Sequence, residues 1–155
     1  MKGKTNIELS FPIISIIGKD VEVMKGLDEY TICLKSFIPN LNKLNEYIID
    51  SQGNFYKRKE VISLGYINFL RGFSLKFAGF GVCYVDKKLE KLKELTVEEL
   101  KEKGKNIIKY KKRYYNETTL NISKFENEFE ILGKREDVLR HLFFFAEPTL
   151  FEKPS

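Results

Sequence analysis

The chain has 155 residues, of which 43% are hydrophobic and 14% aromatic, and its formal net charge is +5. This length predicts a single globular domain over residues 1–155, and the apolar content excludes a disordered or low-complexity chain. No stretch approaches the ~18 apolar residues of a membrane-spanning helix, and the N-terminal apolar stretch is too short for a signal peptide, so we expect a cytoplasmic protein without a membrane partner.

Two hairpins are expected in the first half of the chain. Residues 7–17 and 20–24 have the Ile and Val content of strands, and Gly18 begins a Gly-Lys pair that suits a type II′ turn between them. Residues 46–64 have the same character on either side of the turn-forming residues 51–54. These patterns predict an antiparallel sheet built from hairpins.

A short helix is predicted between the two hairpins. Apolar residues recur at helical spacing from Leu27 to Phe37, and Pro39 would end the helix.

The next segment, residues 65–85, is apolar on both alternating faces, which is typical of a strand buried on both sides. A helix through 66–77 is the alternative. Gly79 and Gly81 indicate a bulge or a close backbone approach. A phosphate-binding loop is the other interpretation of this glycine pair, but the pair lacks the G-x-G-x-x-G frame and a following Lys-Ser/Thr.

Helical patterns dominate from Asp86 onward. Residues 86–95 and 97–115 predict two helices, and Thr96 with Glu99 forms a capping box at the start of the second. Residues 133–146 predict a further helix that ends before Pro148. The fold class that follows is α+β, a single domain with an antiparallel sheet of hairpins and helices mainly in the second half.

Residues 124–132 alternate in polarity and predict a strand with one solvent-exposed face. The exposed face would carry Glu126, Glu128 and Glu130. Three interpretations of these carboxylates stay open: a solvated strand face, a docking patch for a basic protein, and a metal site. The metal site is disfavoured because carboxylates spaced by two along one strand are ~7 Å apart.

The end of the helix predicted over 97–115 is strongly basic. Residues 105–113 contain five bases and no acid, whereas residues 116–155 have a net charge of −3. The tyrosines of this stretch fall on the apolar arc of the helix, away from the bases, which weakens base stacking as their role. The bases could be a solvated helix end that complements the helix dipole, or a surface for nucleic acid or an acidic protein. The nucleic-acid alternative would use Lys105, Lys109, Lys112 and Arg113.

No catalytic constellation is present in the sequence. The only histidine, His141, lies among apolar residues of a predicted helix, without a nearby nucleophile in the sequence. Cys33 and Cys83 are fifty positions apart, match no zinc or C-x-x-C spacing, and are interpreted as buried free thiols. We therefore expect neither an enzyme nor a cofactor.

Residues 11–65 combine a strand, a Gly-Lys turn, a second strand, a short helix and a hairpin around the sequence D-S-x-G. This order resembles small bacterial immunity proteins of contact-dependent or polymorphic toxin systems. The resemblance implies a cytoplasmic α+β protein that holds one cognate toxin inactive by binding it, without chemistry. Such proteins are often acidic, because many of them bind basic nucleases, whereas this chain is basic. The resemblance therefore implies either that the toxin is not a nuclease or that the acidic segment at 126–130 is the contact face.

Overall fold

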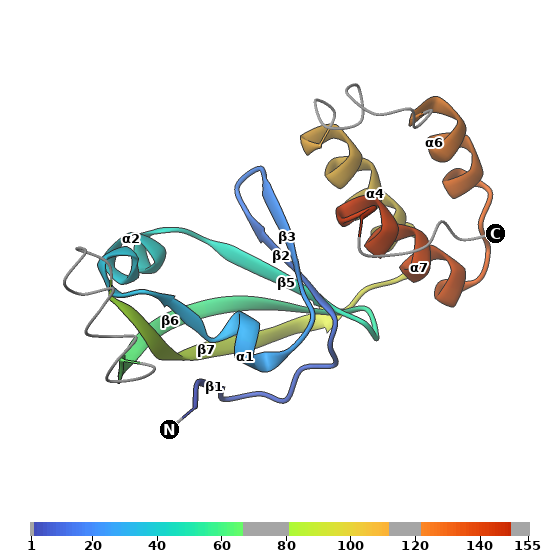
Figure 1. The fold of residues 1–155 in the computed structure, drawn as a ribbon. Helices are drawn as coiled ribbons and strands as arrows, with labels where there is room; N and C mark the ends of the chain where they lie inside the picture. Colours follow the sequence, from blue (N-terminus) through green and yellow to red (C-terminus); the bar gives the residue numbers. More distant parts are fainter. Residues whose placement is uncertain (1, 67–80, 112–121, 150–155) are drawn as a thin grey trace.

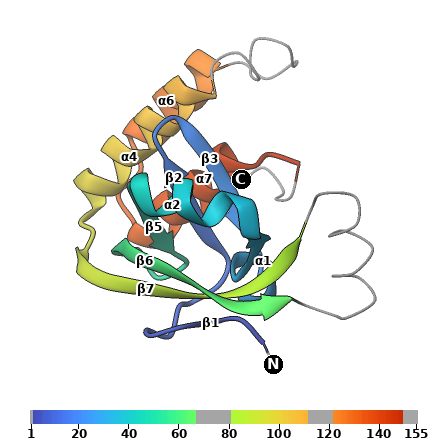
Figure 2. The same cartoon turned by 90° about the vertical axis from the view of Figure 1, so that its left-hand side faces the viewer.

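The computed structural model describes residues 2–66, 81–111 and 122–149. Residues 4–94 contribute all the described strands, which form a strongly curved sheet, and helices α4, α6 and α7 gather beyond one end of it (Figure 1). Helices α1 and α2 lie against the sheet itself (Figure 2). The predicted α+β class, with helices mostly in the second half, is confirmed.

Seven strands form one sheet in the described part of the chain, in the order β1-β7-β6-β5-β2-β3, with β4 paired to β7 beside β1. All pairs are antiparallel except β1 with β7. The strands are β1 (Lys4–Thr5), β2 (Ile13–Ile17), β3 (Asp20–Met24), β4 (Ile32–Leu34), β5 (Glu46–Asp50), β6 (Asn54–Tyr66) and β7 (Val82–Glu94).

Both predicted hairpins are confirmed. Strands β2 and β3 pair from Ile13↔Met24 to Ile17↔Asp20. Gly18 has φ of +61° and no described non-glycine residue has a positive φ, which fits a type II′ turn and not a type I′ turn. Strands β5 and β6 form the second hairpin. At its turn, the Asp50 carboxylate accepts backbone N–H bonds from Gln52 and Asn54 at 3.0 and 2.9 Å.

The single helix predicted between the hairpins is wrong. The segment forms α1 (Leu27–Tyr30), strand β4, a 3₁₀ turn η1 (Lys35–Phe37) and α2 (Ile38–Lys43). Pairing of Ile32–Leu34 with β7 overrides the helical spacing, because an edge of the sheet offers this segment a row of backbone partners. Pro39 stands in the first turn of α2, where its missing N–H costs no hydrogen bond, so it begins a helix here and does not end one.

The helix predicted over 86–95 is also wrong, because this segment is the second half of β7. It pairs with β6 along almost its whole length, with three register shifts. The predicted buried strand at 65–85 is described only at its ends, and Gly79 lies outside the described residues. At Gly81 a side-chain ring, and not a second backbone, approaches closely, since a Cβ there would lie 2.5 Å from the Tyr66 ring.

Helix α4 (Val97–Tyr110) begins with the predicted capping box, in which Thr96 Oγ1 accepts from the Glu99 N–H at 3.2 Å and the Glu99 carboxylate accepts from the Thr96 N–H at 3.3 Å. Helix α7 (Arg135–Ala146) also forms as predicted. Between them, residues Ile122–Glu130 form helix α6, which contradicts the strand predicted over 124–132. Phe125 and Phe129 are one helical turn apart and both are buried.

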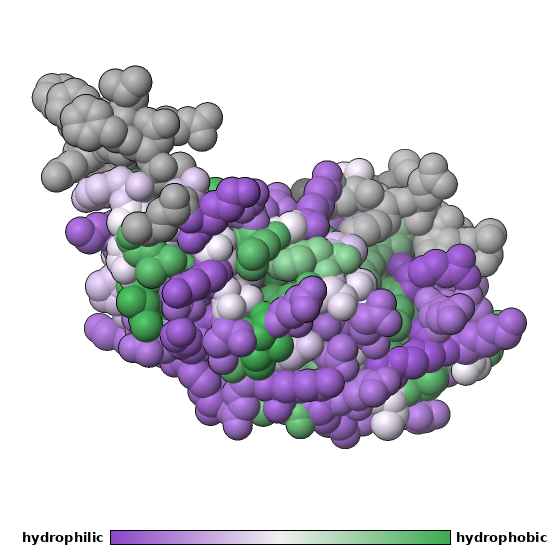
Figure 3. All heavy atoms as spheres, turned by 90° about the horizontal axis from the view of Figure 1, so that it is seen from below, coloured by the Kyte–Doolittle hydropathy of each residue, from purple (hydrophilic) through white to green (hydrophobic). Residues whose placement is uncertain are grey.

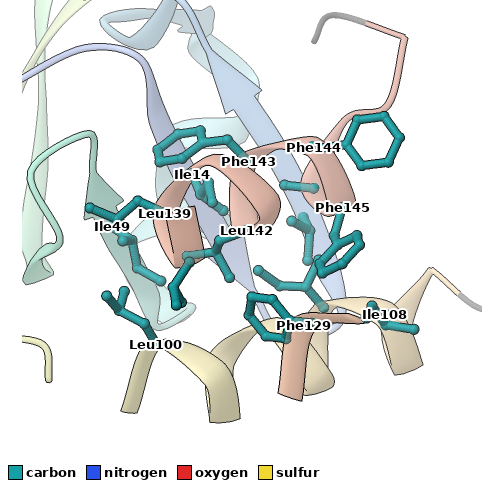
Figure 4. Close-up of a cluster of buried hydrophobic side chains, with 14 of the residues drawn as sticks. Ile14, Ile49, Leu100, Ile108, Phe129, Leu139, Leu142, Phe143, Phe144 and Phe145 are labelled. Carbon is teal, nitrogen blue, oxygen red and sulfur yellow. The ribbon is translucent and has the colours of Figure 1, made fainter. Parts of the chain in front are cut away.

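The main core lies between the three C-terminal helices and one face of the sheet. Ile14 of β2 and Ile49 of β5 meet Leu100 of α4, Phe129 of α6 and Leu142 of α7 (Figure 4).

On the opposite face of the sheet, a second cluster surrounds Tyr30. A third lies where α2 packs over β4, β6 and β7. It contains Cys33, Ile38, Leu41, Val61, Cys83 and Val85.

Candidate functional site

The basic end of α4 is partly occupied by contacts within the chain. Lys105 forms an ion pair with Glu130 of α6, and Lys101 Nζ donates to the Glu130 carbonyl at 2.7 Å. Lys111 donates to the Ala146 carbonyl of α7. Lys109 is exposed, and the other two predicted residues, Lys112 and Arg113, lie outside the described residues.

The three glutamates of the predicted acidic face lie on a helix and do not share one side of it. At 100° per residue, Glu126 and Glu130 are close together while Glu128 points away from both. The hydrogen bond and charge of Lys105 lower the pKa of Glu130, and Glu128 lies 4.0 Å from Lys124 Nζ. Glu126 is exposed. Of the three glutamates, Glu130 is the one that forms an ion pair with a base of α4 among the described residues.

Exposed apolar side chains concentrate elsewhere. Eight large hydrophobic side chains are exposed among the described residues, and five of them come from β4, β6 and the two ends of α2. The most exposed of the five are Phe37 at 53% and Leu44 at 50%, at the two ends of α2. We call this surface the apolar end; it consists of Ile32, Phe37, Leu44, Ile62 and Tyr66.

The five residues of the apolar end are divided between the two faces of the sheet. Cys33 and Val61 pack against α2, and successive residues of a strand point to opposite faces of the sheet. Ile32 and Ile62 therefore lie on the face turned away from α2, opposite Tyr84 and Asp86 of β7. Figure 3 views the molecule from this underside, where apolar patches lie between hydrophilic side chains. Lys35 stands 5.4 Å from the Tyr66 ring centroid, and Lys43 is in the last turn of α2, so the surface has a basic rim.

Helix α2 has only six residues and is held in place by two polar contacts to β6. The side-chain amide of Asn42 donates to the Val61 carbonyl at 3.1 Å and accepts from the Val61 N–H at 2.8 Å. Arg58 Nη2 donates to the Leu41 and Leu44 carbonyls at 2.5 and 3.1 Å, which satisfies the end of the helix.

Arg58 belongs to a buried charged cluster beneath the apolar end. Its other nitrogen donates to Glu46 Oε2 at 2.8 Å, and the Glu46 carboxylate also accepts from the Ser15 hydroxyl. Lys87 Nζ lies 3.9 Å from Glu46 Oε2 and 3.7 Å from the Tyr30 ring centroid. Burial lowers the pKa of Lys87, and it raises the pKa of Tyr30 well above its ordinary value. The cluster positions α2 but is closed to solvent.

The only histidine of the chain lies in the core formed by the C-terminal helices. His141 is buried, and its Nδ1 lies 2.8 Å from the Asp137 carbonyl in the preceding turn, beside the rings of Phe129 and Phe145. Among the described residues, no three His, Cys, Asp or Glu side chains gather closely enough to hold a metal ion. Cys83 is buried as predicted, whereas Cys33 is only half-buried.

Comparison with known proteins gives no significant match. No known protein family matches the chain, and neither a curated protein sequence nor a solved structure is significantly similar to it. Within the described ranges, no helix has both the length and the apolar character that crossing a membrane requires.

Sequence reasoning missed the apolar end, because its five residues are spread from Ile32 to Tyr66 and the segment around Phe37 was predicted to be one helix. The only available signal was Pro39, which begins a helix as readily as it ends one.

Proposed function

We propose that the protein is a non-enzymatic binding protein that neutralises or regulates one protein partner, as immunity proteins do with a toxin, and that it binds this partner through the apolar end. The observation that carries the proposal is the concentration of exposed apolar side chains at the end of the sheet farthest from the C-terminal helices. Phe37 and Leu44 are the most exposed of these side chains on the α2 side, and exposed apolar surface with a polar rim is typical of protein-binding sites.

The support of α2 favours recognition by a preorganised surface. Phe37 and Leu44 flank a helix whose backbone is fixed by Asn42 and Arg58, so little conformational entropy is lost when a partner covers them. Aromatic and aliphatic anchors of this kind supply most of the affinity in such interfaces. Lys35 and Lys43 favour a partner that carries acidic groups around an apolar patch.

The experiment compares matched surface variants in a pull-down from a lysate of the source organism, with and without nuclease. Phe37→Ser with Leu44→Ser should abolish recovery of a stoichiometric protein partner. The control is Leu92→Ser with Ile131→Ser, which removes two side chains that are 43% and 84% exposed at other places. Equal loss in both double variants, or retention in both, would refute the apolar end as the binding site.

Two other surfaces are tested by the same assay. If Glu126→Lys and Glu128→Lys together abolish binding while the apolar variants retain it, the acidic residues of α6 are the contact face. If recovery collapses on nuclease treatment, the nucleic-acid alternative gains support. It would then predict a steep loss of affinity between ~50 and 200 mM salt, which alanine at Lys109 flattens.

A further inference from the structure

The only two cysteines of the chain lie opposite each other on the neighbouring strands β4 and β7. Although Cys33 and Cys83 are fifty positions apart, they are direct partners in the antiparallel ladder of β4 and β7. The ladder continues on both sides, since the Val85 N–H donates to the Thr31 carbonyl at 2.9 Å and the Lys35 N–H donates to the Gly81 carbonyl at 2.7 Å. Directly opposite residues have their side chains on the same face of a sheet.

The spacing of such a pair suits a disulfide. The bonds from Lys35 and Val85 place Cys33 and Cys83 at a hydrogen-bonded position of the ladder, where opposite Cα atoms are about 5.5 Å apart, within the range of about 4.4–6.8 Å found for disulfides. The two Cβ atoms must approach by up to about 1 Å for the bond to close, which the three-residue strand β4 has to allow. The Cys83 thiol already points across the ladder, because it donates to the Cys33 carbonyl at 3.6 Å. Cys83 is completely buried, whereas Cys33 is half-buried and can be reached from solvent.

We propose that Cys33 and Cys83 form a reversible cross-strand disulfide by exchange with a low-molecular-weight disulfide such as oxidised glutathione. The Cys33 thiolate attacks one sulfur of the small disulfide, so a mixed disulfide forms and one small thiolate leaves. The Cys83 thiolate then attacks Cys33 Sγ and releases the second small thiolate. The two protein thiols are oxidised, the small disulfide is reduced to two thiols, and the two protons go to the leaving groups.

The surroundings of Cys33 make this exchange slow at neutral pH and faster in base. Burial raises the pKa of the Cys33 thiol to about 11, and the adjacent Cys83 thiol adds to the rise, while Lys87 and Arg58 lower it. The residues that α2 packs against the pair are the apolar Ile38 and Leu41. Since the thiolate is the attacking species, the rate should rise roughly tenfold per pH unit between about pH 7 and 10.

The bond would attach β4 covalently to its neighbouring strand β7. Strand β4 has three residues and leads directly into η1 and α2. A cross-link between positions fifty apart removes much of the conformational freedom of the unfolded chain. For a chain of this size we expect the thermal midpoint to rise by roughly 5–15 °C on oxidation. The proposal holds whether or not the apolar end is the partner-binding site.

The test exposes the reduced, folded, full-length protein to oxidised glutathione and reads intact mass, followed by non-reducing proteolysis. We expect the wild type to lose two hydrogen atoms and to yield one cross-linked peptide that contains both cysteines. Cys33→Ser should stay unmodified because Cys83 is buried, and Cys83→Ser should stop at the mixed disulfide on Cys33. A matched control is Cys33→Ser with Ile32→Cys, which moves the thiol by one residue and therefore to the other face of the sheet.

Two results would overturn the proposal. One is a folded wild type that stays reduced or keeps glutathione on Cys33 without an internal cross-link, while the denatured chain is oxidised. The other is an equally fast cross-link between Cys83 and the cysteine placed at position 32, because the bond would then reflect chain mobility and not the register of β4.

Discussion

Replacing Arg58 with methionine should destabilise the protein more than any change of a surface charge. Methionine keeps much of the apolar volume but removes the 2.8 Å contact to Glu46 and both bonds to the end of α2. The Arg58 and Glu46 side chains are each only 2% exposed, so the remaining carboxylate cannot regain its hydration. Removing one partner of a buried pair costs about 3–5 kcal/mol of unfolding free energy.

Lys87→Met is the matched control, because Lys87 is buried beside the same carboxylate but lies 3.9 Å from it. Burial lowers the pKa of Lys87, which means that its charge is already poorly accommodated. Its loss removes a contact with the Tyr30 ring and should cost no more than about 2 kcal/mol. The difference between the variants therefore measures the contribution of the direct contacts of Arg58.

Urea unfolding followed by circular dichroism gives the comparison. With a slope of about 2 kcal/mol/M, Arg58→Met should lower the urea midpoint by roughly 1.5–2.5 M. Adding Glu46→Gln to Arg58→Met should recover part of this loss, since no uncompensated carboxylate is then left. A loss for Arg58→Met as small as that for Lys87→Met, or no recovery in the double variant, would refute the account of this cluster.

Two further predictions concern helix packing and pH. A Cβ at Gly104 would lie 2.4 Å from the Phe129 ring. Gly104→Ala should therefore lower the free energy of unfolding by about 1–3 kcal/mol in thermal or urea unfolding, despite the better helix propensity of alanine. The control is Gly133→Ala, where a Cβ meets nothing within 4 Å, and it should change stability by less than about 0.5 kcal/mol. The Tyr56 hydroxyl donates to Asp50 at 3.1 Å, and burial raises the pKa of Tyr56 to about 12. Between pH 10 and 12 the unfolded state loses this proton more readily than the folded state. The wild type should therefore lose roughly 1 kcal/mol of unfolding free energy per pH unit relative to Tyr56→Phe. Parallel plots of unfolding free energy against pH for the two proteins would contradict this.

Local signals predicted the elements whose partners are close in sequence. The Gly18 turn, the second hairpin, the Thr96 capping box and helix α7 all depend on residues within a few positions of each other. The failure at 124–132 has a specific cause. Phe125 and Phe129 are four apart, a spacing that fits a strand face and a helix face equally well. Ile131 fits the strand period, whereas Leu132, three residues after Phe129, fits the helix. In the structure Ile131 is 84% exposed and Leu132 packs against the main core.

The failure at 86–95 reflects pairing over a long distance. Leu89, Leu92 and Leu95 recur every third residue among lysines and glutamates, which are good helix formers. In the structure the register shifts between β6 and β7 break the alternation expected of a strand, and Leu92 becomes exposed. The Cys33–Cys83 pair and the Glu46–Arg58 cluster were invisible for the same reason, since each requires knowledge of which strands pair.

Several of the segregated charges of the sequence form contacts between the C-terminal helices. The basic segment before residue 115 and the acidic segment after it suggested a surface for a charged partner. Yet Lys105 pairs with Glu130, and Lys101 and Lys111 donate to carbonyls of the C-terminal helices. The segregated charges therefore help to hold α4 against α6 and α7. Phe37 and Leu44, by contrast, each leave about half of an apolar side chain exposed to solvent. Exposed apolar area is a stronger indication of a partner than charges that pair within the fold, which is why we propose the apolar end as the binding site.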